Sequence, residues 1–238
     1  MTQIDLCVLA GGFGTRLRSA VAEVPKPLAP VAGRPYLSYL IDSWIGQGVT
    51  SLTFLLHHQA DLIEQFLQVG RQSAGWDACA IHTVREPRPL GTGGSIANAV
   101  RERALPEEFL VVNADTWLGS GVEQLAQELA PTMAVVHVAD ATRYGAVLMR
   151  EGKIVSFLEK QGEARPGWIN AGLYRLSAHW FANWDGAPFS LERELFPTWV
   201  VGGQLRASAL STEFIDIGVP EDYFRFCRWI ETGRKGAP

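Results

Sequence analysis

Residues 9–17 read Leu9-Ala10-Gly11-Gly12-Phe13-Gly14-Thr15-Arg16-Leu17, and residues 25–27 read Pro25-Lys26-Pro27. An apolar run from Ile4 to Ala10 leads directly into the glycines, which is typical of a buried strand that ends in a turn. Glycines let backbone N–H groups approach a ligand closely and surround an anion. Arg16 and Lys26 add two positive charges. The stretch therefore predicts a loop that holds phosphates.

Two common phosphate-loop patterns do not fit these residues. The pattern GxxxxGK[ST] needs a lysine directly after its second glycine, and no such lysine is present. The dinucleotide pattern GxGxxG matches at Gly12 and Gly14 but has Leu17 in place of the third glycine. An oxidoreductase that binds NAD or FAD is therefore disfavoured.

The composition is that of an ordinary globular protein. The chain has 238 residues, of which 47% are hydrophobic and 19% are charged, and its formal net charge is -4. This charge disfavours binding to nucleic acid. No apolar run is long enough to predict a membrane span, and the N-terminus lacks the features of a secretory signal. The cysteines, Cys7, Cys79 and Cys227, form no CxxC pair, so we expect a cytoplasmic protein without a zinc or redox site.

Strands alternate with helices in the first half of the chain. The expected strands are residues 3–10, 51–56, 78–84 and 109–113, and the expected helices are 35–47, 60–69 and 94–103. This alternation predicts a Rossmann-like α/β fold with a mixed, mainly parallel sheet flanked by helices. Ligands of such sheets bind beyond the carboxyl ends of the strands, where both glycine-rich segments and Asp115 fall.

The second half is less regular. The expected strands are residues 132–137, 145–149, 153–158, 171–176, 205–210 and 214–217, followed by a helix over 221–232. We find no internal repeat, low-complexity segment or linker. A single domain over residues 1–238 is therefore expected.

Two aspartates follow separate strands. They lie in the segments Val112-Asn113-Ala114-Asp115-Thr116 and Phe214-Ile215-Asp216-Ile217-Gly218. Mg²⁺ is typically held by one or two carboxylates together with substrate phosphates, so Asp115 and Asp216 are candidate ligands. Each aspartate taken alone is better explained as a turn or capping residue. His57 and His58 are expected in a loop or turn, with no acidic partner nearby in the sequence.

The string GGxGTRL…PKP resembles the signature of the sugar-1-phosphate nucleotidyltransferases, and the resemblance extends from Leu9 to about Tyr223. It is carried further by PKPLAPVAGRPYL, EPRPLGTGGSIANA, RYGAV, FLEK, INAGLY, FSLERELFP and FIDIGVPEDY. Within the family, these strings are most similar to the guanylyltransferases that act on heptose 1-phosphate. The resemblance implies the nucleotide-diphospho-sugar transferase fold. It also implies a nucleotide-binding half over about residues 1–118 and a sugar-binding half over about 119–238.

The resemblance implies a set of nucleotide-binding residues. They are Leu9, Ala10, Gly11, Gly12, Gly14, Thr15, Glu86, Gly91 and Thr92. Glu86 stands five residues before Gly91, at the position that reads the nucleobase edge in this family. A carboxylate has only acceptors, and guanine presents its N1–H and 2-amino donors side by side, so Glu86 favours GTP. The alternative is a surface glutamate in a proline-rich loop.

The resemblance also implies the residues that carry the chemistry. The expected catalytic residues are Arg16, Lys26, Asp115 and Asp216, of which the two aspartates hold Mg²⁺. The expected sugar-phosphate-binding residues are Tyr144, Gly145, Glu159, Lys160 and Asn170. Ala114 departs from the family, which often has glycine there.

The expected reaction transfers GMP from GTP to D-glycero-α-D-manno-heptose 1-phosphate and gives GDP-heptose and pyrophosphate, for a surface polysaccharide such as capsule. The binding partners are then GTP and a sugar 1-phosphate, without nucleic acid or membrane, and the chain could form a homodimer. One alternative is a nucleotidyltransferase that uses mannose 1-phosphate, or UTP, dTTP or CTP. Another is a non-catalytic sensor of nucleotide sugars on the same fold.

Overall fold

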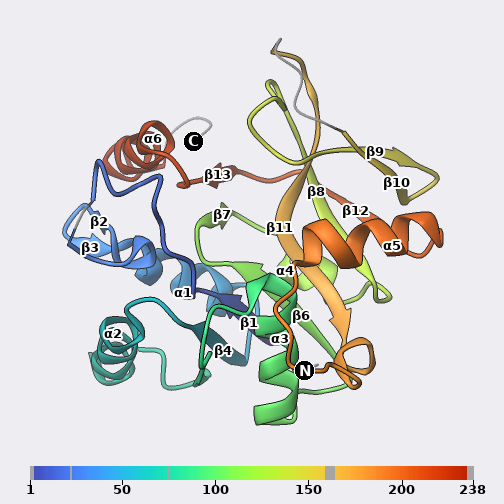
Figure 1. Cartoon of the computed structure of the whole chain (residues 1–238). Coiled ribbons are helices and arrows are strands. Elements are labelled where there is room, and N and C mark those ends of the chain that lie inside the picture. The colour runs from blue at the N-terminus through green and yellow to red at the C-terminus, as the bar shows by residue number, and fades with distance from the viewer. Residues whose placement is uncertain (1–2, 22, 74, 159–163, 235–238) are drawn as a thin grey trace.

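The computed structural model describes residues 3–21, 23–73, 75–158 and 164–234, and these form a central sheet of nine strands flanked by helices (Figure 1). In chain order, the strands are β1 (Asp5–Leu9), β4 (Ser51–Leu56), β5 (Ala80–Arg85), β6 (Glu108–Asn113), β8 (Thr132–Val138), β9 (Ala146–Arg150), β10 (Lys153–Leu158), β11 (Gly167–Ser177) and β12 (Arg206–Leu210). They lie side by side in the order β5-β4-β1-β6-β11-β8-β12-β10-β9.

The sheet contains both strand directions. β1 is parallel to β4 and β6, β4 is parallel to β5, and β8 is parallel to β12. β11 lies antiparallel between β6 and β8 and so joins the two parallel groups. The carboxyl ends of β1, β4 and β6 meet at one edge of the sheet, which is where open α/β sheets bind ligands. The predicted mixed α/β fold is confirmed.

Helices cover both faces of the sheet. They are α1 (Tyr36–Gly46), α2 (Ala60–Ser73), α3 (Gly91–Arg103), α4 (Val122–Leu125), α5 (Phe196–Val201) and α6 (Pro220–Glu231), with shorter helical segments η1 (Lys26–Leu28), η2 (Ala178–Phe181) and η3 (Leu191–Leu195). Two small antiparallel ribbons complete the chain: β2 (Pro30–Val31) with β3 (Arg34–Pro35), and β7 (Thr116–Leu118) with β13 (Phe214–Asp216).

The hydrophobic core is divided into two layers by the sheet. Along β1, Leu6 and Val8 belong to the layer that includes α1, α2 and α6, whereas Cys7 belongs to the layer that includes α3 and α5. This alternation follows from the two-residue period of a strand. All six residues of β4 are buried, as expected for a parallel strand that is covered on both faces.

Several predicted boundaries require correction. The helix expected from residue 94 begins at Gly91, and the strand expected over 171–176 extends over residues 167–177. The η3–α5 segment and the β7–β13 ribbon were not predicted as such. The division into two halves near residue 118 stays a prediction. No helix in the described part of the chain has both the length and the apolar character needed to cross a membrane.

Candidate active site

The first glycine-rich segment lies at the carboxyl end of β1. The backbone N–H of Ala10 donates to the carbonyl of Leu55 in β4, and the N–H of Ala114 donates to the carbonyl of Leu9, so the three strand ends stay in register. Gly14 has φ +59, a left-handed conformation that favours glycine. The N–H of Leu17 donates a hydrogen bond to the carbonyl of Gly14 and closes the turn.

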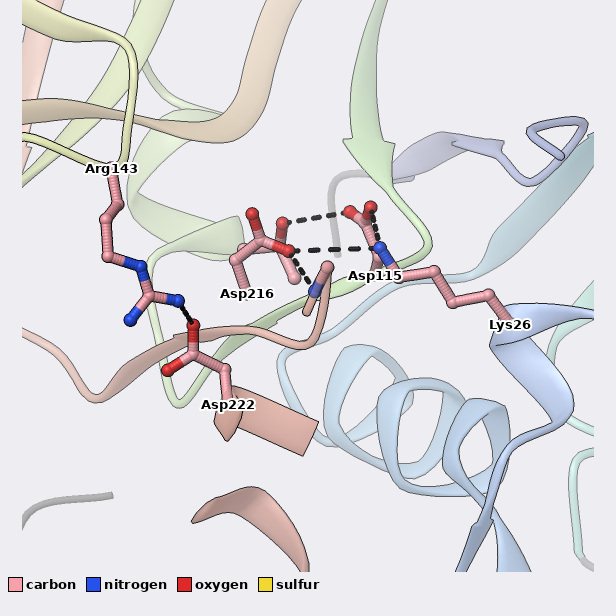
Figure 2. A network of polar contacts seen from close by, with 7 residues as sticks. Lys26, Asp115, Arg143, Asp216 and Asp222 are labelled. Carbon is pink, nitrogen blue, oxygen red and sulfur yellow. Dashed lines mark hydrogen bonds and ion pairs between the residues drawn. The ribbon is translucent and has the colours of Figure 1, made fainter. Parts of the chain in front are cut away.

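Lys26 lies opposite Asp115 and Asp216 (Figure 2). Its Nζ is 2.6 Å from Asp115 Oδ2 and 4.0 Å from Asp216 Oδ1. The β7–β13 ribbon brings the two aspartates together, because Asp115 directly precedes β7 and Asp216 ends β13, opposite Thr116. Asp216 Oδ1 also accepts a hydrogen bond of 2.7 Å from the N–H of Gly218.

The two carboxyl groups have different proton affinities. Burial alone would raise the pKa of Asp115, but the Lys26 ammonium and the hydrogen bonds from Lys26 and Thr116 outweigh it and hold this pKa below its ordinary value. Burial and the negative charge of Asp115 raise the pKa of Asp216 to about 6, against the opposing charge of Lys26. The cluster thus combines one strongly ionised carboxylate with one that binds a proton more readily.

Asp115 and Asp216 suit a divalent metal whose other ligands come from a substrate. Within the described residues, no group of three or more His, Cys, Asp or Glu side chains could hold a metal by itself. Mg²⁺ needs only one or two carboxylates when substrate phosphates and waters supply the remaining oxygens. The donor set of the two aspartates therefore fits Mg²⁺ bound together with a nucleotide.

A cavity of about 350 Å³ lies between the two glycine-rich segments. It is lined by Leu9, Gly11, Gly12, Phe13, His57, Glu86, Pro89, Gly91, Thr92, Ser95, Asn113, Asp115 and Glu192. We call it the Glu86 cavity. A Cβ placed on Gly11 would lie 3.0 Å from Glu86 Oε1 and 3.2 Å from the backbone N of His57. A side chain at residue 11 would therefore press on Glu86 and His57 in the wall of the cavity.

A second cavity of about 390 Å³ adjoins the first. It is lined by Leu9, Ala10, Gly12, Phe13, Gly14, Thr15, Arg16, Lys26, Pro27, Ala114, Asp115 and Gly218. We call it the Lys26 cavity. Leu9, Gly12, Phe13 and Asp115 line both cavities, so the two are contiguous. One cavity is lined by the carboxylate of Glu86 and the other by the cations Arg16 and Lys26.

The second glycine-rich segment has a structural role as well. Its Gly93 and Gly94 N–H groups donate to the carbonyl of Phe189, at 3.0 Å and 3.3 Å. Thr92 Oγ1 donates to Glu192 Oε2 at 2.7 Å and accepts from the N–H of Leu191. Gly91 and Thr92 line the Glu86 cavity, and their nucleotide-binding role stays a prediction. The hydrogen-bonding groups of this segment largely hold residues 189–192 in place.

The expected sugar-binding residues are only partly described. Glu159 and Lys160 lie outside the described residues. Tyr144 and Gly145 form a loop next to Asn170 of β11, whose N–H donates to the carbonyl of Gly145 at 2.9 Å. The side chain of Asn170 bonds the hydroxyl of Tyr174 and the N–H of Gly172. The sugar-binding roles of all five residues stay predictions.

Sequence reasoning missed several residues of the Glu86 cavity, namely Phe13, His57, Ser95, Asn113 and Glu192. His57 directly follows β4, so the rule that ligands bind at carboxyl ends of strands could have marked it. Glu192 reaches the cavity from a distant part of the chain, and no local pattern signals that approach.

Residues 6–232 match the family model described as Nucleotidyl transferase. The chain belongs to this family, and the predicted resemblance is confirmed. It is 30% identical over 226 residues to the D-glycero-α-D-manno-heptose 1-phosphate guanylyltransferase of Aneurinibacillus thermoaerophilus, and the match covers 92% of this chain and 95% of that protein.

Two further relatives have similar identity. The chain is 32% identical to the catalytic subunit beta of mannose-1-phosphate guanylyltransferase of Drosophila pseudoobscura pseudoobscura; the match covers 96% of this chain but only 63% of that protein. The crystal structure of HddC from Yersinia pseudotuberculosis superposes with a TM-score of 0.84 at 32% identity, covering 96% of this chain and 100% of that one. HddC has also been solved in complex with GMP-PN.

Proposed function

We propose that the protein is a sugar-1-phosphate guanylyltransferase that transfers GMP from GTP to a sugar 1-phosphate and releases pyrophosphate. The observation that carries this proposal is the continuity of the Glu86 and Lys26 cavities, which share Asp115. A nucleotide that spans them has its base beside Glu86 and its phosphates beside Lys26 and Arg16. Family membership and the guanylyltransferases among the relatives support the same activity.

The choice of GTP rests on the chemistry of Glu86. Its two oxygens are acceptors, which match the N1–H and 2-amino donors of guanine. Uracil and thymine present one donor flanked by acceptors and so pair poorly with a carboxylate. The HddC complex with GMP-PN supports a guanine nucleotide in a related protein.

We propose a heptose 1-phosphate as the second substrate, with mannose 1-phosphate as the alternative. The relative from Aneurinibacillus thermoaerophilus is named for a heptose substrate, and relatives named for mannose 1-phosphate match the chain at similar identity. A GDP-heptose product would supply a glycosyltransferase that builds a surface polysaccharide such as capsule.

In the proposed reaction, a phosphate oxygen of the sugar 1-phosphate attacks the α-phosphorus of GTP in line, and pyrophosphate leaves. The attacking phosphate has a second pKa near ~6 and is ionised at neutral pH, so neither a protein nucleophile nor a general base is needed. Arg16 and Lys26 stabilise the charge on the phosphates, and Asp115 and Asp216 would hold Mg²⁺. When bound, Mg²⁺ would neutralise phosphate charge. Lys160 would hold the sugar phosphate.

Turnover of an Asp216→Asn variant separates this proposal from a non-catalytic sensor. We expect pyrophosphate release from GTP and heptose 1-phosphate to fall on the order of 10²–10³-fold, as for other preorganised charge stabilisers. Lys26→Met should give a loss of similar size. Glu221→Gln, a substitution at an exposed carboxylate outside both cavities, is the matched control. Undiminished turnover of Asp216→Asn would contradict the metal assignment, and no turnover in the wild type would favour the sensor.

A further inference from the structure

The Glu86 carboxylate is held in one orientation by two donors. The backbone N–H of Leu90 donates to Oε2 at 2.9 Å, and the hydroxyl of Ser95 donates to Oε1 at 2.8 Å. A carboxylate has about four lone-pair positions, two on each oxygen. Each oxygen of Glu86 therefore keeps one acceptor position, and the side chain lines the wall of the cavity. Two acceptors held in one plane complement the two adjacent donors of guanine.

Ser95 is well placed to hold the Glu86 carboxylate in this orientation. Ser95 lies near the start of α3, is only 3% exposed, and lines the same cavity as Glu86. A helical serine ordinarily bonds a backbone carbonyl one turn earlier or points to solvent. Here its hydroxyl is directed instead to a side chain nine residues earlier.

The position of Ser95 is fixed by the segment that crosses the start of α3. The carbonyl of Phe189 accepts from both Gly93 and Gly94, and Thr92 bonds Glu192. A Cβ on Gly93 would lie 2.1 Å from the ring of Phe189, so α3 and this segment can pack this closely only because Gly93 has no side chain. The first turn of α3 is therefore anchored on one side, and Ser95 bonds Glu86 from an anchored position.

On the basis of the guanylyltransferase function proposed above, we propose that Ser95 is a specificity-determining residue that orients Glu86 for the paired recognition of N1–H and the 2-amino group of guanine. The terminal torsion of a glutamate is broad, so a carboxylate without this donor turns more freely about its axis. Recognition of GTP requires both Glu86 carboxylate oxygens to lie in the plane of the guanine base. ITP, whose base lacks the 2-amino group, needs only one oxygen and tolerates the rotation.

The ratio of GTP to ITP affinity tests this role. Calorimetric titration of the full chain should give a wild-type ratio on the order of 10–100, because one hydrogen bond to a charged group is lost with ITP. Ser95→Ala should reduce the ratio to about 1–3, because only the paired contact depends on the orientation of Glu86. The same ratio of kcat/KM values, measured by pyrophosphate release, should fall in parallel.

Ser38→Ala is the matched control, since it removes another buried helical hydroxyl that does not line the cavity. The ratio of GTP to ITP affinity of this variant should equal that of the wild type. If Ser95→Ala does not fold, Ser95→Cys keeps the side-chain size with a much weaker donor and is measured in its place. A wild-type ratio in the Ser95 variant would overturn the orienting role, whatever the absolute affinities. UTP titrated into the wild type tests the proposed function separately: binding as tight as that of GTP would overturn guanine recognition itself.

Discussion

The glycines of residues 11–14 differ in what their conformations require. Gly14 has φ +59, and a Cβ there would lie 3.1 Å from Lys26 Cβ. Gly12 has no heavy atom within 4 Å of its Cβ position, yet it lines both cavities. The backbone therefore needs glycine at residue 14, whereas at residue 12 the nucleotide would need it.

This difference predicts that one alanine substitution lowers stability and the other weakens nucleotide binding. Gly14→Ala should lower the free energy of unfolding by about 1–2 kcal/mol, because alanine is strained in the left-handed region. Gly12→Ala should leave it within about 0.5 kcal/mol of the wild type but weaken GTP binding, because its methyl group enters ligand space. Urea unfolding and calorimetric titration measure the two effects. Greater destabilisation by Gly12→Ala would contradict the assignment.

At the residue scale, the sequence identified much of the site but not its contacts. Spacing and resemblance singled out Lys26, Asp115 and Asp216, and the structure brings these three together. The hydrogen bond from Ser95 to Glu86 could not be predicted, because a serine near a helix start has several local acceptors and no pattern chooses among them. The roles of Lys26, Asp115 and Asp216 in binding and catalysis stay predictions.

At the element scale, α3 depends on close packing against residues 187–191. Gly93→Ala should lower the free energy of unfolding by about 1–3 kcal/mol, because its methyl group overlaps the ring of Phe189. Gly46→Ala is the matched control: Gly46 ends α1 with no heavy atom within 4 Å of its Cβ position. That substitution should raise stability by about 0.5–1 kcal/mol. Equal effects of the two substitutions in thermal or urea unfolding would argue against tight packing at α3.

The loop that carries Tyr144 and Gly145 is tied to the start of α6. Arg143 forms an ion pair with Asp222, whose side chain is 3% exposed (Figure 2). Arg225 lies 3.3 Å from the same carboxylate. Asp216 lies a few residues before α6, so this ion pair links the expected sugar loop to the expected metal ligand.

Asp222→Asn should therefore raise KM for the sugar phosphate by about 10-fold and leave KM for GTP unchanged, because it releases the sugar loop but not the Glu86 cavity. Glu221→Gln removes a neighbouring carboxylate that is 81% exposed and lies 3.5 Å from Arg143, and it should change neither constant appreciably. Steady-state kinetics with each substrate varied in turn measures both. An equal rise of both KM values would indicate a general loss of structure.

Element prediction failed where partners are distant in sequence. The three-residue strand β7 exists because it pairs with β13, and no local pattern signals that pairing. The η3–α5 segment was also missed; in the structure, Pro197 lies in the first turn of α5, and η3 directly precedes this helix. The regular strands and helices of the first half were predicted well because their hydrophobic patterns are long and clear.

At the scale of the whole molecule, the last helix completes the core of the first half. Phe226 of α6 is fully buried, and its ring centroid lies 4.9 Å from that of Tyr36 and 5.6 Å from that of Trp117. The hydroxyl of Tyr223 also donates to the carbonyl of Pro30. Helix α6 is therefore packed into the same core as α1 and β7.

Phe226→Ala should lower the free energy of unfolding by about 3–5 kcal/mol, as expected for a large aromatic side chain removed from a core. Phe224, on the same helix, is 48% exposed, so Phe224→Ala should lower it by less than about 1 kcal/mol. Urea unfolding followed by tryptophan fluorescence compares the two variants. A small effect of Phe226→Ala would mean that α6 is dispensable for the core.

The order of the strands was beyond the reach of the sequence. Alternating strands and helices predicted a mainly parallel sheet, and the β5-β4-β1-β6 group follows that pattern. The insertion of β11 between β6 and β8 depends on pairing between distant segments, which hydrophobic periodicity does not encode. A separate pairing of β11 with β9 places the loop of Tyr144 and Gly145 beside Asn170, another expected sugar-binding residue.

Guanylyl transfer is tested most directly by a matrix of substrates. Pyrophosphate release is measured for GTP, UTP, dTTP and CTP, each with heptose 1-phosphate and with mannose 1-phosphate. The carboxylate of Glu86 and the adjoining cation-lined cavity predict the highest kcat/KM with GTP, and the resemblance along the chain predicts heptose 1-phosphate as the better acceptor. Equal or greater kcat/KM with UTP, dTTP or CTP would contradict guanine recognition by Glu86.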